Sequence, residues 1–168
     1  MACTLGGLRN SCGRTNTPGI NSLYIAIYNS AVTFSVTAGV CNGITGASFY
    51  TYEPAPTSSD WNDAGSGVKE TLSWTHIHTV IAYFPGNSAA IRNEIYLLSQ
   101  SKMVVVVEDM KGDLYLLGKD NGLWATEETF NSGKKAGDGK GWTLKLDGEN
   151  AEPAVTVSSI AVLGTLAS

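Results

Sequence analysis

The sequence predicts a mainly β fold with one α-helix. Three observations lead to this expectation. Several segments alternate apolar and polar residues, residues 104–107 form an uninterrupted apolar run, and only residues 88–101 space their apolar side chains as a helix does. A chain of 168 residues is long enough for one hydrophobic core, and no linker divides it. We therefore expect a single domain over residues 1–168.

The strands of the N-terminal half are predicted from composition and alternation. Residues 23–28 are rich in β-branched and aromatic side chains, and residues 31–40 alternate Val and Phe with Ser and Thr. Residues 47–53 form a shorter run of the same type. Residues 68–84 predict a long strand, in which every second side chain shares a face. One face of that strand carries Leu72, Trp74, His76 and His78.

Residues 54–67 contain too little hydrophobic pattern for a strand or helix, and we expect a long loop between two strands there. Long loops in compact domains are often functional. Trp61 within it is a candidate contact with a partner, because tryptophan is enriched at binding hot spots. The candidate inter-subunit contact residues are Trp61, Asp60, Pro54 and Pro56. The alternative is that Trp61 folds back onto its own domain.

The helix expected at residues 88–101 can be capped by Asn87 or Ser88. Its apolar stripe consists of Ile91, Ile95 and Leu98. So short a helix needs to pack on a sheet, and the apolar strand at residues 104–107 is the surface it would cover.

The remaining strands are expected after the helix. A turn at Gly112 leads back into a strand at residues 114–117, and further strands are predicted at residues 142–146 and 153–158. The apolar residues 160–166 are expected to add one more strand. Residues 131–141, rich in glycine and lysine, are expected to form a flexible loop.

Charge is sparse and unevenly placed along the chain. Charged residues make up 15% of the sequence, against roughly 25% in ordinary soluble domains. Before Glu53 the only charged side chains are Arg9 and Arg14. Such depletion is typical of interface cores and predicts burial against other subunits, although a surface of Ser, Thr, Asn and Gly is the alternative. The net charge of −4 argues against tight nucleic-acid binding through phosphate neutralisation.

The residues that could carry chemistry do not form a recognisable active site. His76 and His78 can face the same way on a strand and could ligate zinc or iron, but no third ligand recurs at a suitable spacing. We expect a structural pair, no metal and no cofactor. The three cysteines are an odd number without zinc-site spacing, and no nucleophile motif occurs, so we expect no enzyme. No secretory signal or apolar run of about 18 residues is present.

Several stretches resemble small tail structural proteins of phages, especially phages of Bacteroidetes. The resemblance is one of pattern and spans most of the chain. It is carried by residues 92–98, 104–109 and 112–118, by Cys3, Cys12 and the Pro18-Gly19 turn before the first strand, and by residues 141–144 and 152–155 near the end.

This resemblance implies a tail tube protein, a structural subunit and no enzyme. Such subunits have a β-sandwich or half-barrel with one flanking helix, and six copies close into a ring whose strands form a continuous β-barrel. The rings stack, and a long loop of each subunit reaches the next ring. Residues 54–67 match that loop, with Trp61 as its anchor, and residues 88–101 match the helix.

The same resemblance implies the partners and the location. The partners are further copies of the chain, other virion tail proteins and genomic DNA that passes through the lumen without sequence-specific binding. A net negative charge suits a channel that must not hold DNA. No membrane is involved. The expected location is the virion, in the phage tail, after assembly in the host cytoplasm.

Three other interpretations remain open at this point. The subunit could be a head–tail joining, tail terminator or baseplate protein, or the inner tube of a contractile injection apparatus. It could instead be a β-sandwich fibre or carbohydrate-binding module, which would require an exposed platform formed by Trp61, Trp124 and Trp142. A small β-barrel metal enzyme would require a third ligand beside His76 and His78.

Overall fold

Strands dominate the computed structural model, which describes residues 19–135, 137–164 and 166–167. The described part contains eleven strands and one α-helix. The strands are β1 (Ile20–Ile27), β2 (Thr33–Thr37), β3 (Val40–Thr45), β4 (Tyr50–Tyr52), β5 (Asp60–Val68), β6 (Ser73–Pro85), β7 (Lys102–Asp109), β8 (Leu114–Leu117), β9 (Leu123–Asn131), β10 (Gly141–Asn150) and β11 (Val155–Val157). The helices are α1 (Ala89–Ser99) and two short 3-10 turns, η1 (Pro56–Ser58) and η2 (Ile160–Leu163).

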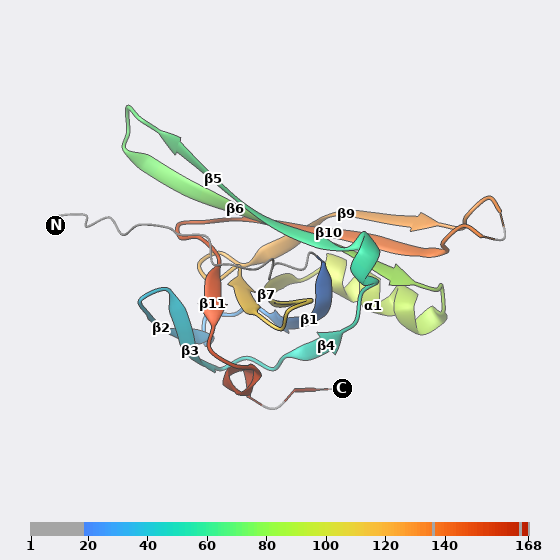
Figure 1. The fold of residues 1–168 in the computed structure, drawn as a ribbon, viewed down its shortest axis with the longest axis horizontal. Helices are drawn as coiled ribbons and strands as arrows, with labels where there is room; N and C mark the ends of the chain where they lie inside the picture. The colour runs from blue at the N-terminus through green and yellow to red at the C-terminus, as the bar shows by residue number, and fades with distance from the viewer. Residues whose placement is uncertain (1–18, 136, 165, 168) are drawn as a thin grey trace, which may run out of the picture.

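The sheet branches at β7, as Figure 1 shows. Along one side, β7 pairs with β1, which continues to β4. Along the other side, the C-terminal part of β7 pairs with β8, and its first two residues pair with β9. One branch then runs through β8, β11, β3 and β2, and the other through β9, β10, β6 and β5. The chain is mainly β and sandwich-like, as expected, and its sheet is open.

Two hydrophobic cores lie on opposite faces of β1 and β7. Alternate residues of these strands point into each core, which explains why residues 104–107 are apolar without interruption. The first core joins them to β6, β10 and α1, and its most central members are Leu23, Ile25, Val80, Ile95, Met103, Val105, Leu144 and Leu146. The second core joins them to β3, β8, β11 and η2, through Tyr24, Cys41, Phe49, Val104, Val106, Leu116, Val157 and Leu163.

The helix α1 is confirmed within the expected range. Ser88 is its N-cap, and the Ser88 hydroxyl accepts a hydrogen bond from the Ile91 N–H at 3.2 Å. Ile95 and Leu98 are buried in the first core. The predicted stripe therefore faces the sheet, and the opposite side of α1 is left to solvent.

The long loop expected at residues 54–67 is wrong for most of its length. Residues 60–68 form β5, which pairs with β6 over nine successive residue pairs. Gly65 and Gly67 argued for a loop, but both lie beneath the side chain of Trp74, where a side chain at residue 67 would overlap the indole ring. Pairing with the long β6 strand overrides the weak strand preference of this segment.

Two smaller differences concern the ends of the chain. Residues 160–163 form the 3-10 turn η2 where a strand was expected, and Ala167 forms an isolated bridge with Tyr50. Cys41 is a buried free thiol in the second core. Cys3, Cys12 and the Pro18-Gly19 turn were part of the family resemblance, and of these only Gly19 is among the described residues.

Candidate assembly surface

The β5–β6 hairpin extends beyond the rest of its layer. β10 accompanies β6 from Pro85 only as far as the pair His76–Asn150, so residues 66–75 have only each other as strand partners. We call residues 66–75 the arm. It projects from the body of the molecule at the upper left of Figure 1. A two-stranded hairpin alone is at best marginally stable in water, so the arm depends on what holds its base.

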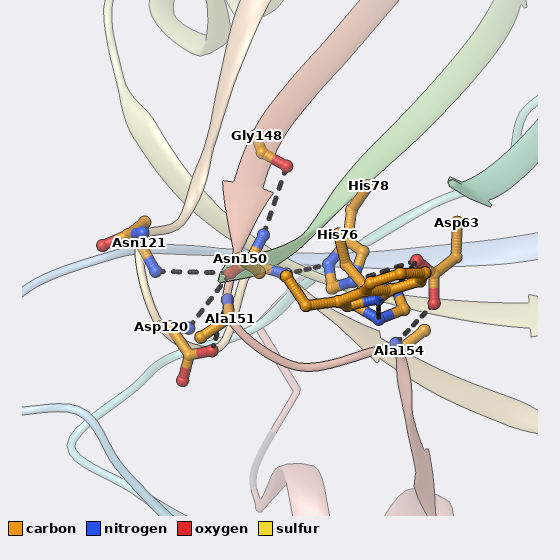
Figure 2. A network of polar contacts seen from close by, with 11 residues as sticks. Asp63, His76, His78, Asp120, Asn121, Gly148, Asn150, Ala151 and Ala154 are labelled. Atoms are coloured by element: carbon orange, nitrogen blue, oxygen red, sulfur yellow. Dashed lines mark hydrogen bonds and ion pairs between the residues drawn. The ribbon is translucent and has the colours of Figure 1, made fainter. Parts of the chain in front are cut away.

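A polar network fixes the base of the arm (Figure 2). The Trp74 indole N–H donates to His76 Nε2 at 3.0 Å, so this ring nitrogen carries no proton. His76 Nδ1–H therefore donates to Asp63 Oδ1 at 2.8 Å. The other oxygen of Asp63 accepts the Ala154 N–H at 2.8 Å. This network connects both strands of the hairpin to the segment that leads into β11.

His78 extends the same network into the protein. His78 is only 1% exposed, and the Gly118 N–H donates to His78 Nδ1 at 3.2 Å. A backbone N–H can only donate, so the proton of neutral His78 lies on Nε2, 3.7 Å from Asp63 Oδ1 and without a hydrogen-bond partner. Burial lowers the pKa of His78, although Asp63 opposes the shift. The ring is therefore neutral at pH 7.

The opposite side of the arm base is held by Asn150, which is buried at the end of β10. Its Oδ1 accepts the N–H groups of Asp120 and Asn121 at 3.2 and 3.3 Å, and its Nδ2 donates to the Gly148 carbonyl at 3.3 Å. The Ala151 N–H donates in turn to Asp120 Oδ2. These bonds, also drawn in Figure 2, attach the turn before β9 to the end of β10. The layer is therefore fixed where the arm leaves it.

Two free edges bound the layer of β9, β10, β6 and β5, which we call the four-stranded layer. Among the described residues, β5 pairs only with β6, and β9 pairs only with β10 from Ala125 to Asn131. All three pairings within the layer are antiparallel. The β5 edge contains no lysine or proline, the residues that commonly guard edge strands. Unpaired edges of this kind are templates for pairing with another chain.

The outer face of the four-stranded layer, which points away from the first core, carries an excess of acid. Asp60, Ile81, Lys145 and Glu127 stand side by side across the four strands. The charged side chains of this face are Asp60, Glu127, Asp147, Glu149 and Lys145. Partial burial alone would raise the pKa of Asp147, but hydrogen bonds from Thr79, Thr126 and Lys145 lower it. The Asp147 carboxyl group therefore stays ionised at neutral pH.

Large apolar side chains are exposed on the arm and on α1. Leu72, at the tip of the arm, is 90% exposed, and Trp74 is 61% exposed. Leu72 also has a positive φ of 51°, a conformation unfavourable for a branched side chain. On the outer side of α1, Tyr96 is 60% exposed. Large exposed apolar side chains are candidates for contacts with another molecule.

The predicted contact residues lie at the base of the hairpin. Trp61 is half-buried against the first core, with its ring centroid 4.8 Å from that of Tyr115. Asp60 is exposed on the outer face, Pro54 is buried, and Pro56 begins η1 and is exposed. Their contacts with a partner stay predictions. Sequence reasoning missed the exposure of Leu72 and Trp74. The strand expected at residues 68–84 is wrong at its start, because residues 69–72 form the turn between β5 and β6, and Leu72 in this turn has a positive φ, so strand alternation does not place it on the face of Trp74.

The other interpretations lack a matching site. Trp61 and Trp142 face the first core, whereas Trp124 is on the opposite face of the layer, level with Asp147. These three side chains do not form one exposed platform. Within the described parts of the chain, no three or more His, Cys, Asp or Glu side chains are placed to hold a metal ion together. The nitrogen atoms of His76 are both engaged in the hydrogen bonds described above.

Comparison of the chain with protein-family models, curated proteins and solved structures gave no match. No helix in residues 19–135, 137–164 and 166–167 has the length and apolarity needed to cross a membrane.

Proposed function

We propose that this chain is a structural subunit that assembles into closed rings through the two free edges of its four-stranded layer. The observation that carries the proposal is that both edges, β5 and β9, belong to one antiparallel layer. Because the four strands alternate in direction, β5 of one copy against β9 of the next continues the antiparallel order without a break. Such a heterologous contact closes a ring when the rotation fits.

The stagger of the two edges supports closure into a barrel. The middle of β5, Ala64, is level with Ile77 on β6, whereas Glu128, in the middle of the free part of β9, is level with Ala82 through Leu144. The edges are thus about four or six residues out of step across four strands; the offset has to be even, because an odd one would set Ala64 of the outer face opposite Glu128 of the inner face. With ~3.3 Å per residue and ~4.8 Å between strands, pairing them tilts the strands by roughly 40°. Closed barrels have tilts of about 35–45°.

The outer face of the layer would then line the inside of the ring. Its excess of acid over the single cation Lys145 suits a channel through which DNA passes without being held. Together with the family resemblance, this leads us to propose a phage tail tube subunit in the virion. Six copies would form each ring, rings would stack into the tube, and other tail proteins would bind its ends. A joining, terminator or baseplate subunit is the nearest alternative.

No catalytic or cofactor role enters the proposal. His76, His78 and Asp63 are the most chemically capable cluster that the structure describes, and they are held in hydrogen bonds that support the arm. The absence of a joint aromatic platform among Trp61, Trp124 and Trp142 gives no support to the carbohydrate-binding alternative.

The test is negative-stain electron microscopy with light scattering of the purified protein over a concentration series. We expect hollow rings or tubes of uniform diameter. Ala64→Pro, on the β5 edge, should abolish them, because proline removes an N–H and is poorly tolerated once the edge is paired. Ser35→Pro, on the free edge of β2, is the matched control. A wild-type protein that remains monomeric throughout, or an Ala64→Pro variant that still forms rings, would contradict the proposal.

A further inference from the structure

The inner face of β6 changes from buried to exposed along a single strand. His78, Val80 and Ala82 alternate on this face and are all buried by the protein's own core. Two residues before His78 the face continues with His76, and then with Trp74, which is 61% exposed. The strand therefore keeps a core-like pattern beyond the point where its own domain provides a core. No described residue of the chain covers the exposed side of Trp74, which leaves that side open to a partner.

Trp74 is held in a fixed position with one face bare. Its indole ring lies over Gly65 and Gly67, where an added side chain would meet the ring. Its N–H is already engaged by His76 Nε2 at 3.0 Å. A partner that covers this ring would leave no N–H group without a hydrogen bond. It would also cost little side-chain entropy, because the ring is already held in place. Both properties favour a contact residue.

Leu72, at the tip of the arm, has both an unfavourable backbone conformation and an exposed apolar side chain. Leu72 combines a φ of 51° with 90% exposure. A branched side chain is strained in this conformation, and glycine or asparagine would avoid the strain. Leu72 is thus strained and also exposes an apolar side chain. The two observations together indicate that the leucine itself is used in a contact.

We propose that the arm of one subunit packs against α1 of the neighbouring copy in the ring. The receiving hollow lies between α1 and the β9–β10 hairpin, has a volume of about 440 Å³ and is lined in part by Arg92, Asn93, Tyr96, Glu128 and Trp142. It adjoins the free edge of β9 through Glu128. The proposed pairing of β5 with that edge brings the inner face of the arm over this hollow.

The chemistry of the hollow suits the arm. Tyr96 offers an exposed aromatic ring, and aromatic pairs contribute energy beyond the area they bury. Arg92 is oriented by a hydrogen bond from its Nε to Asn87 Oδ1 at 3.1 Å, and guanidinium groups stack favourably on tryptophan faces. The exposed side of α1 and the bare side of Trp74 are therefore complementary surfaces of the same chain.

This inference rests on the proposed ring, and its test is a double-mutant cycle on assembly. The variants are Trp74→Ala, Tyr96→Ala and their combination, with the association constant measured by sedimentation velocity. Each single change should weaken association at least tenfold, as hot-spot truncations do, and the double variant should lose less than the product of the two. Circular dichroism checks that each variant remains folded.

Trp124→Ala is the matched control, because Trp124 is a similarly exposed tryptophan, 50% accessible, on the other face of the layer. It should assemble like wild type. If Trp74→Ala also assembles normally while Ala64→Pro does not, the ring stands and the arm contact is wrong. If the two truncations are strictly multiplicative, the side chains do not meet and the inference fails. A wild-type protein that never associates overturns both proposals.

Discussion

The two halves of the β5–β6 hairpin share a strand pairing but differ in everything that surrounds it. At the base, β6 has β10 on its other side, and its inward side chains, such as Val80 and His78, are buried. In the arm, residues 66–75 pair only with each other, and Trp74 and Leu72 are exposed. The difference teaches that one regular hairpin has two environments: its base belongs to the fold, whereas its arm stays exposed and is the part that we propose contacts a partner.

The difference in burial between the base and the arm can be tested most directly by placing a charge in each of them. Val80→Asp buries a carboxylate at a position that is 0% exposed and should lower the free energy of unfolding by about 4 kcal/mol or more. Thr75→Asp, in the arm, should change it by no more than about 0.5 kcal/mol. Urea unfolding followed by circular dichroism measures both. Similar losses in the two variants would mean that the arm is part of the cooperative fold.

A change at the boundary of the two halves should have an intermediate effect. Gly67→Ala places a methyl group against the indole ring of Trp74 and should displace the ring from His76, at a cost of about 1–3 kcal/mol. Gly43→Ala, on β3, is the control, because its nearest neighbour is Ser35 Cβ at an ordinary 3.5 Å. Tryptophan fluorescence reports the ring, and thermal unfolding reports stability. An unmoved emission maximum in Gly67→Ala would argue against the described packing.

Lowering the pH should reduce folding stability through the base of the hairpin, where His78 is buried, and not through the arm. The pKa of folded His78 is lowered by burial, so below the unfolded value of about 6.5 the unfolded chain binds a proton that the folded chain does not. Stability should therefore fall as the pH drops from 7 to 5, by at most about 1.4 kcal/mol per pH unit from this residue. The measurement is urea unfolding at several pH values, with His78→Gln as comparison. An equally steep slope in that variant would exclude His78 as its source.

The smallest expected effect is a gain in stability at the arm tip. Leu72→Asn replaces a branched side chain at φ 51° with one that tolerates this region, and should stabilise the monomer by up to about 1 kcal/mol. Thermal unfolding of the monomer measures it. The same substitution should weaken ring formation, so that stability and assembly change in opposite directions. A variant that loses stability would show that Leu72 supports the fold of its own chain.

The sequence predicted those parts of the fold in which local pattern and final environment agree. The run Val104–Val107 is covered on both faces, and Ser88 caps a helix that buries Ile95 and Leu98. Prediction failed where the determining partner is distant in sequence or the local residues point elsewhere. β5 contains glycines that indicate a loop, and β9 has two adjacent glutamates and a bulge that hide its alternation.

The candidate assembly surface was even harder to predict from the sequence than the fold. His76 and His78 were expected to be a structural pair, which suits the hydrogen bonds that hold them, but their partners were invisible in the sequence. Asp63 meets an amide 91 positions away, and His78 meets one 40 positions away. Free edges also cannot be read from a sequence, because they are defined by the strand that is missing beside them.

The bond between Asp63 and the Ala154 N–H also bears on the order in which the protein is completed during synthesis. Contacts between distant positions form late, since a large loop must close first. A nascent chain that has not yet reached Ala154 lacks one of the donors that anchor Asp63, and with it part of the support of the hairpin. In the proposed assembly, the β5 edge therefore takes its final position only after residue 154 has been synthesised, so shorter nascent chains should not join a ring.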